Sequence, residues 1–301
     1  MKNLLVVGGT GFIGFHIIKK AKKKKFTISS ISLHNPKKHR LHKDVNYIKV
    51  DIADLRSLNN KLKNISIDYV INAGGYGEHP DFGTKGTKLI KSHLYGTINL
   101  LQIVKKKKIK KFIQIGSSAE YGKVKSPIHE STECLPNTPY AIAKISCTNI
   151  ILSLCRNIKF SATIFRLFQV YGPFQDKNRV IPYLIKNCLQ NKKFKTTSGN
   201  QYNDFCHVDD VVDAIFKSLF LKSTNGKIIN LGSGKPLKII NLILLIKKII
   251  GKGQPSVGAL KYKKGMNMKN FPNINKAKTL LKWRPKIQLI AGIKNTINSL
   301  K

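Results

Sequence analysis

The sequence predicts an α/β protein with a doubly wound parallel sheet and a smaller second part towards the C-terminus. A short apolar strand at the N-terminus runs into glycines at positions 8, 11 and 14. Apolar strand patterns then alternate with helical patterns as far as Arg166, which is typical of a parallel sheet covered by helices. After Arg166 the pattern changes to turns and short helices, which indicates a second unit.

The expected elements follow from these patterns in chain order. We expect strands near residues 3–7, 26–33, 46–50, 68–72, 111–116 and 160–166, and helices near 12–24, 54–63, 86–107 and 139–156. Further on, we expect helices near 180–191, 208–222 and 239–250, a turn at 199–200 and a strand near 227–231. These patterns predict a dinucleotide-binding part over 1–167, to which 206–232 returns, and a substrate-binding part over 168–205 and 233–301.

The first strand ends in a glycine-rich turn that leads into a helical pattern. A backbone that turns sharply and approaches a pyrophosphate closely has no room for side chains, and the free N–H groups of the following helix attract the anion. A glycine-rich turn without a ligand is the alternative. The residues expected to bind a dinucleotide here are Gly8, Thr10, Gly11, Phe12, Ile13 and Gly14.

The end of the second strand carries no acid, since the chain contains no Asp or Glu from Gly14 to Lys43. An NAD site usually has a carboxylate there to accept the ribose hydroxyls. The strand runs instead into small polar and cationic residues that end at Arg40, which suit a 2′-phosphate. We therefore expect NADP(H), with NAD(H) as the alternative, and place Ser32 and His34 beside the ribose.

Two tyrosines are followed by a lysine four residues later, but only one pair is placed to do chemistry. Tyr140 and Lys144 share a face of the expected helix 139–156, whereas Tyr121 lies just before a Ser-Pro pair, where a helix is not expected. The strand at 111–116 ends in serines at the sheet edge where such folds bind ligands. We expect the hydroxyl of Ser117 to reach a carbonyl held near Tyr140.

These motifs, taken together, resemble the extended short-chain dehydrogenase/reductases, the epimerase, dehydratase and reductase family that acts on nucleotide sugars. The resemblance covers nearly the whole chain, in Gly8-x-x-Gly-x-x-Gly14, Asp51-Ile-Ala-Asp54, Ser117-Ser-Ala-Glu-Tyr-Gly122, Pro136-Asn-Thr-Pro-Tyr-Ala-Ile-Ala-Lys144, Arg166-Leu-Phe-Gln-Val-Tyr-Gly-Pro173, Asp204-Phe-Cys-His-Val-Asp-Asp210 and Lys282-Trp-Arg-Pro-Lys286.

The resemblance implies a Rossmann fold and a role for each motif. Asp51 and Ile52 would meet the adenine, and Ala73, Gly74 and Gly75 would pass under the nicotinamide half. Tyr140 would donate the proton in reduction, Lys144 would favour the phenolate and hold the nicotinamide ribose, and Ser117 would polarise the carbonyl. No metal is required.

Within this family, the positions after Ser117 separate the reactions. Dehydratases carry an acid within the next two positions, where this chain has Ser118 and Ala119, so dehydration is disfavoured. The chain looks most like the 4-ketoreductases of the abequose-synthase or 6-deoxyhexose type, which implies reduction of a nucleotide-activated 4-keto-6-deoxy sugar for a surface polysaccharide. A 4-epimerase with tightly held NAD is the alternative. A redox-inactive protein that binds RNA or a protein partner is a third hypothesis.

The chain departs from the family pattern at three places, which are Gln169, Asn203 and His93. Asn203 replaces an arginine expected to contact the diphosphate, His93 replaces an asparagine and is expected to be structural, and Glu120 is expected to be a solvated or loop-bonding acid. The residues that could hold the diphosphate in its place are Arg179, Lys186, Tyr262 and Lys264. The residues expected to border the substrate are Tyr76, His79, Ser118, Gln169, Arg179 and Asn203.

The net charge of +41 raises the question of a nucleic-acid partner. Only 6 of the 55 basic residues are arginine, which phosphate and base recognition favour, so nucleic acid is not the expected partner. The five cysteines lack metal-type spacing and fit reduced thiols in a cytoplasmic protein, and no apolar stretch has the ~20 residues of a membrane span. Family resemblance implies a homodimer through the helices at 86–107 and 139–156.

Overall fold

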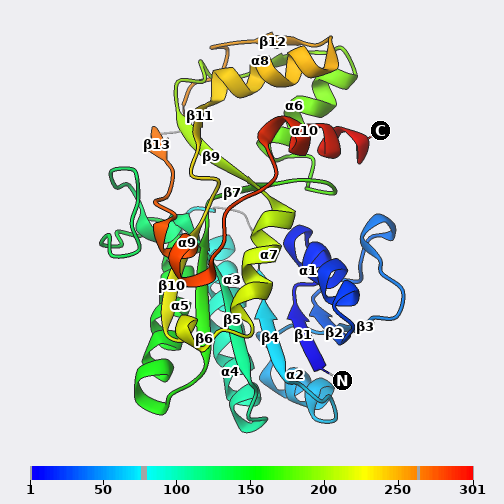
Figure 1. Cartoon of the computed structure of the whole chain (residues 1–301), viewed down its shortest axis with the longest axis vertical. Coiled ribbons are helices and arrows are strands. Elements are labelled where there is room, and N and C mark those ends of the chain that lie inside the picture. The colour runs from blue at the N-terminus through cyan, green and yellow to red at the C-terminus, as the bar shows by residue number, and fades with distance from the viewer. Residues whose placement is uncertain (1, 76–79, 263–264, 301) are drawn as a thin grey trace.

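Seven parallel strands form the main sheet, in the spatial order β10-β6-β5-β4-β1-β2-β3 (Figure 1). The computed structural model describes residues 2–75, 80–262 and 265–300. The order runs outward from β1 in both directions, so the sheet is doubly wound, as predicted, and a ligand site is expected beside β1, where the order reverses. The strands are β1 (Lys2–Val7), β2 (Phe26–Ser32), β3 (Asn46–Lys49), β4 (Tyr69–Asn72), β5 (Lys111–Ser117), β6 (Ala162–Leu167) and β10 (Lys227–Leu231).

Helices cover both faces of this sheet, because alternate strand residues point to opposite sides. Leu4 and Val6 of β1 pack with one set of helices, and Leu5 and Val7 pack with the other. The first set is α1 (Phe12–Lys23), α7 (Val208–Ser218) and α9 (Asn275–Leu281), and the second is α2 (Leu55–Leu62), α4 (Gly96–Lys106) and α5 (Pro139–Ile158). No helix in the described part of the chain has the length and apolarity to cross a membrane.

The helix predicted over 86–107 consists of three segments. It comprises α3 (Thr84–Ile90), a π-helical turn at Lys91–Tyr95, and α4. The apolar spacing resembles one continuous helix, so the sequence does not reveal this local change of winding. Gly96 follows the turn, and a Cβ there would lie 2.5 Å from Ile52 Cγ1, so close packing against the neighbouring loop requires glycine at this point.

A smaller part lies beyond the carboxyl ends of the main strands, at the top of Figure 1. Its apolar cluster comes mainly from α6 (Val180–Leu189), α8 (Ile239–Ile250) and α10 (Leu289–Asn298). One small sheet joins β9 (Tyr202–His207) to β7 (Gln169–Tyr171), β11 (Pro236–Lys238) and β13 (Lys269–Asn270), and another pairs β8 (Lys193–Lys195) with β12 (Gln254–Ser256). The sequence did not predict β9, because its polar residues do not alternate clearly and its partners are distant in the chain.

A buried lysine at the start of β5 predicts how stability changes with pH. Lys111 is 2% exposed, its Nζ donates to Thr224 Oγ1 at 3.0 Å and to Asn225 Oδ1, and burial lowers its pKa to about 8. Between pH 8 and 10.5 the unfolded chain therefore binds more protons than the folded one. The free energy of unfolding should rise across this window by about 3 kcal/mol from this group.

The Lys111→Met variant isolates that contribution, because the other lysines titrate alike in both proteins. Urea unfolding at pH 7 and pH 10 should show a larger rise for the wild type than for the variant. Equal rises in the two proteins would contradict the assigned cause.

Candidate active site

Two adjoining cavities open at the carboxyl ends of the central strands. The larger has a volume of about 640 Å³ and the smaller about 180 Å³, and both are lined by Gly11 and by the segment 73–75 that follows β4. Of the predicted site residues, the larger cavity is lined by Gly11, Phe12, Ile13, Gly14, Ala73, Gly74, Gly75, Ser117, Ser118, Tyr140, Lys144, Gln169 and Arg179. The smaller is lined by Gly8, Thr10, Gly11, Ser32, His34, Asp51, Ile52, Ala73, Gly74 and Gly75.

The glycine turn after β1 is packed so tightly that side chains are excluded from it. Gly8 has a φ of +76°, and a Cβ on it would lie 2.6 Å from Gly74 Cα. A Cβ on Gly14 would lie 2.1 Å from Gly8 O. The helix α1 starts here with Gly11 as its N-cap, without a capping side chain or an acid in its first turn. Its first N–H groups are therefore suited to a pyrophosphate.

Tyr140 and Lys144 lie one turn apart at the start of α5, because Thr138 caps this helix and Pro139 begins it. The Lys144 Nζ lies 5.8 Å from the centroid of the Tyr140 ring. It also donates to Ile115 O at 2.9 Å, which ties this helix to β5. The ring of His93 stands nearly perpendicular to that of Tyr140, with centroids 5.5 Å apart, and also lines the larger cavity.

The other tyrosine–lysine pair lies outside this site. Tyr121 is fully buried, and its hydroxyl donates to Asn230 Oδ1 at 2.7 Å. The guanidinium carbon of Arg166 lies 4.4 Å from its ring centroid. Burial raises the pKa of Tyr121 to about 12, so this phenol is poorly suited to proton transfer near neutral pH.

Ser117 ends β5 at the cavity wall, where the chain turns into a short 3-10 helix, Ser118–Tyr121. Its hydroxyl oxygen accepts a hydrogen bond from the Ala119 N–H at 3.2 Å. The expectation for Glu120 is wrong in one respect, because this side chain is fully buried and not solvated. It does bond within the loop, since its carboxylate accepts the Ser117 N–H at 2.8 Å.

Some of the residues predicted for the substrate lie elsewhere. Asn203 lies outside both cavity linings, although Phe205, two residues further along β9, lines the larger one, and an amide is shorter than the arginine usual there. Lys186 and Tyr262 are also outside the linings, and the Tyr262 hydroxyl accepts the Asn200 N–H at 3.0 Å. Tyr76, His79 and Lys264 fall outside the described residues.

Sequence reasoning also missed several polar residues of the larger cavity. Three of them, Gln175, Asp176 and Asn178, form a polar run just before α6, which is a readable sign of a loop at a ligand site. The other two, Asn267 and Asn270, reach the cavity because β13 pairs with β9. No local pattern in the sequence indicates that pairing.

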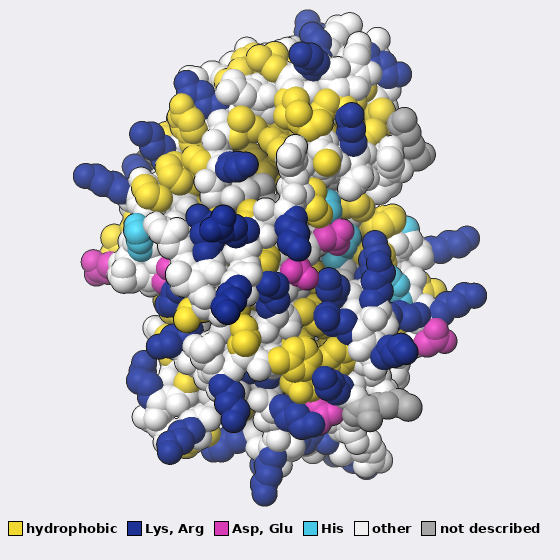
Figure 2. All heavy atoms as spheres, viewed as in Figure 1, with side chains coloured by type: hydrophobic (Ala, Val, Ile, Leu, Met, Phe, Trp, Pro, Cys, Tyr) yellow, Lys and Arg dark blue, Asp and Glu magenta, His cyan; other side chains and the backbone are white. Residues whose placement is uncertain are grey.

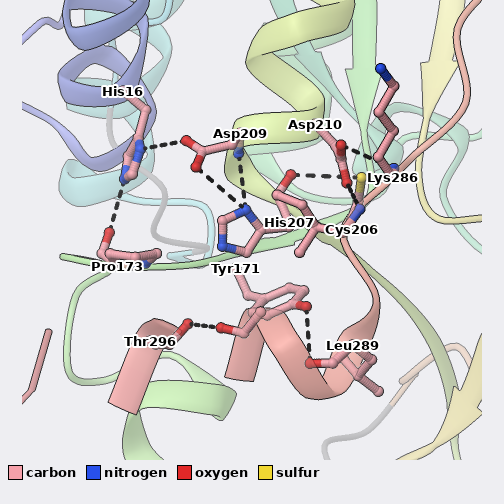
Figure 3. Close-up of polar contacts among 12 residues, drawn as sticks. His16, Tyr171, Pro173, Cys206, His207, Asp209, Asp210, Lys286, Leu289 and Thr296 are labelled. Carbon is pink, nitrogen blue, oxygen red and sulfur yellow. Dashed lines mark hydrogen bonds and ion pairs between the residues drawn. The ribbon is translucent and has the colours of Figure 1, made fainter. Parts of the chain in front are cut away.

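Figure 3 shows how the chain that follows β7 is held by a residue of α1. The ring of His16 on α1 lies between the Asp209 carboxylate, at 3.1 Å, and the carbonyl oxygen of Pro173, at 2.9 Å (Figure 3). The hydrogen bond from His16 lowers the pKa of Asp209. Next to Pro173, the carbonyl of Phe174 accepts from Arg40 Nε at 3.1 Å.

Arg40 is therefore not free to meet a 2′-phosphate, in contrast to the prediction. It is 5% exposed, and its Nη2 donates to Asp176 Oδ1 at 2.8 Å. His16 and Arg40 thus hold the segment 173–176, of which Gln175 and Asp176 line the larger cavity. The physical reason is an ion pair: the carboxylate of Asp176 already binds this buried guanidinium.

Basic side chains are spread widely over the face seen in Figure 2. Lysine and arginine cover both its upper and lower halves, with apolar and uncharged side chains between them, and do not form one stripe (Figure 2). A single-stranded nucleic-acid site would instead combine a basic groove with exposed aromatic rings. This face therefore gives no support to the RNA-binding alternative.

Comparison with known proteins gives consistent matches. A family model described as "NAD dependent epimerase/dehydratase family" matches residues 4–232. A putative UDP-glucose 4-epimerase of Methanocaldococcus jannaschii is 30% identical, over 99% of this chain and 98% of its own. The crystal structure of a UDP-glucose 4-epimerase from Thermotoga maritima with UDP-glucose has a TM-score of 0.93 and 27% identity, covering 99% of this chain and 98% of that one.

A second solved structure contains both a sugar nucleotide and a coenzyme. It is a UDP-glucuronic acid 4-epimerase from Bacillus cereus in complex with UDP-glucuronic acid and NAD. It has a TM-score of 0.88 and 27% identity, and the match covers 99% of this chain and 98% of that one. These likenesses confirm the predicted doubly wound α/β fold.

Proposed function

Because the chain belongs to the NAD dependent epimerase/dehydratase family, we propose that it is a nucleotide-sugar 4-epimerase that works with bound NAD. Membership confirms the expected kind of enzyme, one that depends on a nicotinamide coenzyme. One observation supports the proposal most: Ser117, Tyr140 and Lys144 all line the larger cavity, which adjoins the glycine turn. The relatives described above are named as 4-epimerases of UDP-sugars, which favours the 4-epimerase alternative over the 4-ketoreductase that the sequence resembled most.

In this proposal, the three side chains move one proton at the C4 oxygen of the sugar. NAD, when bound, supplies the acceptor and later the donor of a hydride. Tyr140 takes the proton from the C4 hydroxyl as the carbonyl forms, and returns it when the sugar has presented its other face. Lys144 places its charge one turn from the phenol and would hold the nicotinamide ribose, and Ser117 donates a hydrogen bond to the C4 oxygen.

The cofactor part of the proposal fits the residues that are present. The glycine turn and the free N–H groups at the start of α1 would hold the pyrophosphate. The residues lining the smaller cavity would then hold the adenosine half, with Asp51 and Ile52 at the adenine and Ser32 and His34 at the ribose.

The substrate part of the proposal uses the residues around the larger cavity. Ser118 and Gln169 would border the sugar, and Arg179 is the described lining residue best suited to the diphosphate. We also keep Tyr76 and His79 as sugar-side candidates. In domain terms, 1–167 and 206–232 would bind the coenzyme, and 168–205 with 233–301 would bind the substrate.

Dehydration is the family reaction that these residues support least. It requires an acid to assist loss of water between C5 and C6, and the two residues after Ser117 are Ser118 and Ala119. Glu120 does not replace that acid, because its carboxylate is fully buried and bonded to protein groups. This leaves reactions confined to C4.

The coenzyme preference is tested most directly at Ser32, which lines the smaller cavity where an NAD enzyme usually carries an acid. The relative with bound coenzyme contains NAD, so we propose NAD(H) in place of the NADP(H) first expected. The Ser32→Asp variant should shift the ratio of the dissociation constants for NADH and NADPH by about 10-fold or more towards NADH, because a carboxylate accepts the ribose hydroxyl and repels a phosphate.

Fluorescence titration of the purified variant with each coenzyme measures that ratio. The dissociation constant for UDP-sugar serves as the control and should not change. An unchanged ratio would remove Ser32 from the ribose site.

A second candidate function is reduction of a nucleotide-activated 4-keto-6-deoxy sugar, in deoxysugar biosynthesis for a surface polysaccharide. The observation that favours it is the missing acid after β2, which leaves NADPH acceptable, and a reductase must exchange its coenzyme at every turnover. The same three side chains would serve, with Tyr140 as proton donor. We further propose a cytoplasmic homodimer that pairs through the helical segments at 86–107 and 139–156, which correspond to α3, the π-helical turn and α4 on one side and to α5 on the other.

One assay separates the candidates. An epimerase converts UDP-galactose to UDP-glucose, or UDP-galacturonate to UDP-glucuronate, without added coenzyme, and chromatography detects the product. A reductase oxidises NADH or NADPH when given UDP-, CDP-, dTDP- or GDP-4-keto-6-deoxyhexoses. No conversion in either format would exclude both functions and favour a redox-inactive protein that binds RNA or a protein partner.

A further inference from the structure

A buried carboxylate connects the two elements, β5 and α5, that carry the three candidate catalytic side chains. Glu120 is fully buried, and its Oε1 accepts the Ser117 N–H at 2.8 Å. Its Oε2 accepts from Thr148 Oγ1 at 2.8 Å and from Arg166 Nε at 2.8 Å. One side chain therefore joins the end of β5, the middle of α5 and the strand β6.

Two partners of Glu120, Ser117 and Thr148, belong to the elements that carry the candidate catalytic side chains. Ser117 carries the candidate hydroxyl, and Thr148 lies four residues after Lys144, on the same face of α5. The same helix is tied to β5 a second time, because Lys144 Nζ donates to Ile115 O at 2.9 Å. The two bonds together fix α5 against the end of β5.

We propose that Glu120 is a positioning residue, which sets the distance between the Ser117 hydroxyl and the Tyr140 phenol. This inference rests on the proposed function only for its effect on rate. A catalytic side chain keeps its reactive geometry when the residues that support it are themselves held by hydrogen bonds. A misplacement of about 1 Å can lower the rate about 100-fold. A small displacement of Ser117 relative to Tyr140 would slow the proton transfer without unfolding the protein.

The charge of Glu120 determines which variant tests the idea. Burial by itself disfavours the charged guanidinium of Arg166, but the Glu120 carboxylate and the neighbouring Tyr121 and Cys134 together more than offset this and raise the pKa of Arg166. Replacing Glu120 would leave a buried, unpaired cation, so such a variant can fail to fold for reasons unrelated to catalysis. Thr148 is the better target, because its hydroxyl contacts Glu120 without sharing in the ion pair.

The test compares Thr148→Val with Thr148→Ser. Valine has the shape of threonine without the hydroxyl, so the bond to Glu120 is lost, and we expect kcat to fall about 10-fold or more while the KM for the sugar nucleotide and the NADH dissociation constant stay within about 2-fold. Serine restores the hydroxyl and should recover most of kcat. Ser153→Ala on the same helix is the matched control, because Ser153 is bonded to Asn157 and not to this site.

A readout without substrate separates this inference from the proposed function. Hydrogen exchange of the Ser117 amide should be about 10-fold or more faster in Thr148→Val than in the wild type, since the acceptor of that amide becomes less fixed. If no substrate is converted but this acceleration is seen, the proposed function fails and the positioning contact stands. Unchanged exchange, or unchanged kcat in an active enzyme, would overturn the assignment of Glu120.

Discussion

The Tyr140→Phe variant should lose kcat by about 10³-fold while it keeps its fold and its affinity for coenzyme. The expectation follows from the role proposed for the phenolic oxygen of Tyr140, which exchanges a proton with the C4 oxygen of the sugar. Phenylalanine retains the ring, which packs against His93 and lies 5.8 Å from Lys144 Nζ. The substitution removes the phenolic hydroxyl, and with it the transferable proton.

The measurement is the steady-state conversion of the substrate found in the assay above, with KM, NADH affinity and thermal unfolding determined in parallel. Tyr183→Phe is the matched control, because Tyr183 is half-exposed on α6 and lies outside the cavity lining. A Tyr140→Phe enzyme with more than about a tenth of wild-type kcat would refute the assigned proton donor.

Gly14→Ala should weaken coenzyme binding by about 100-fold or more. A Cβ at this position would lie 2.1 Å from Gly8 O and 2.6 Å from Gly9 Cα, and both are backbone atoms that cannot turn aside. The turn must therefore open, and the N–H groups at the start of α1 move away from the place of the pyrophosphate. The loss of affinity corresponds to about 2.7 kcal/mol.

Coenzyme affinity can be measured by fluorescence titration with NADH, and stability by urea unfolding without ligand. Gly258→Ala provides the control, because a Cβ there would meet nothing within 4 Å, although its φ of +84° adds some strain. Affinity in Gly14→Ala within a few fold of the wild type would show that the turn does not hold the coenzyme.

The part of the site that the sequence predicted is the part built from local patterns. The glycine spacing after β1, the serine at the end of β5 and the Tyr140–Lys144 pair each occupy a few neighbouring residues, and all of them line the two cavities. The parallel sheet could be predicted for the same reason, since each strand–helix unit has its own apolar period.

The rest could not be predicted because it depends on contacts between distant segments. Asn270 reaches the cavity only through the pairing of β13 with β9. The burial of Glu120 was not predicted, since it depends on Arg166, which lies 46 residues further along the chain. Arg40 appeared to be a phosphate ligand for the same kind of reason, as its partner Asp176 is 136 residues away.

The anchoring of residues 173–176 by His16 and Arg40 has a kinetic consequence. Arg40 belongs to the loop that follows β2, and the first residues of that loop, Leu33 and His34, line the smaller cavity. The bonds of Arg40 therefore connect this loop to residues 173–176, part of which forms the wall of the larger cavity beside the place proposed for the sugar nucleotide. Because the anchoring bonds are made within the protein, the wall needs no bound coenzyme to keep its place. An enzyme that exchanges coenzyme would therefore not have to order this wall again in each cycle.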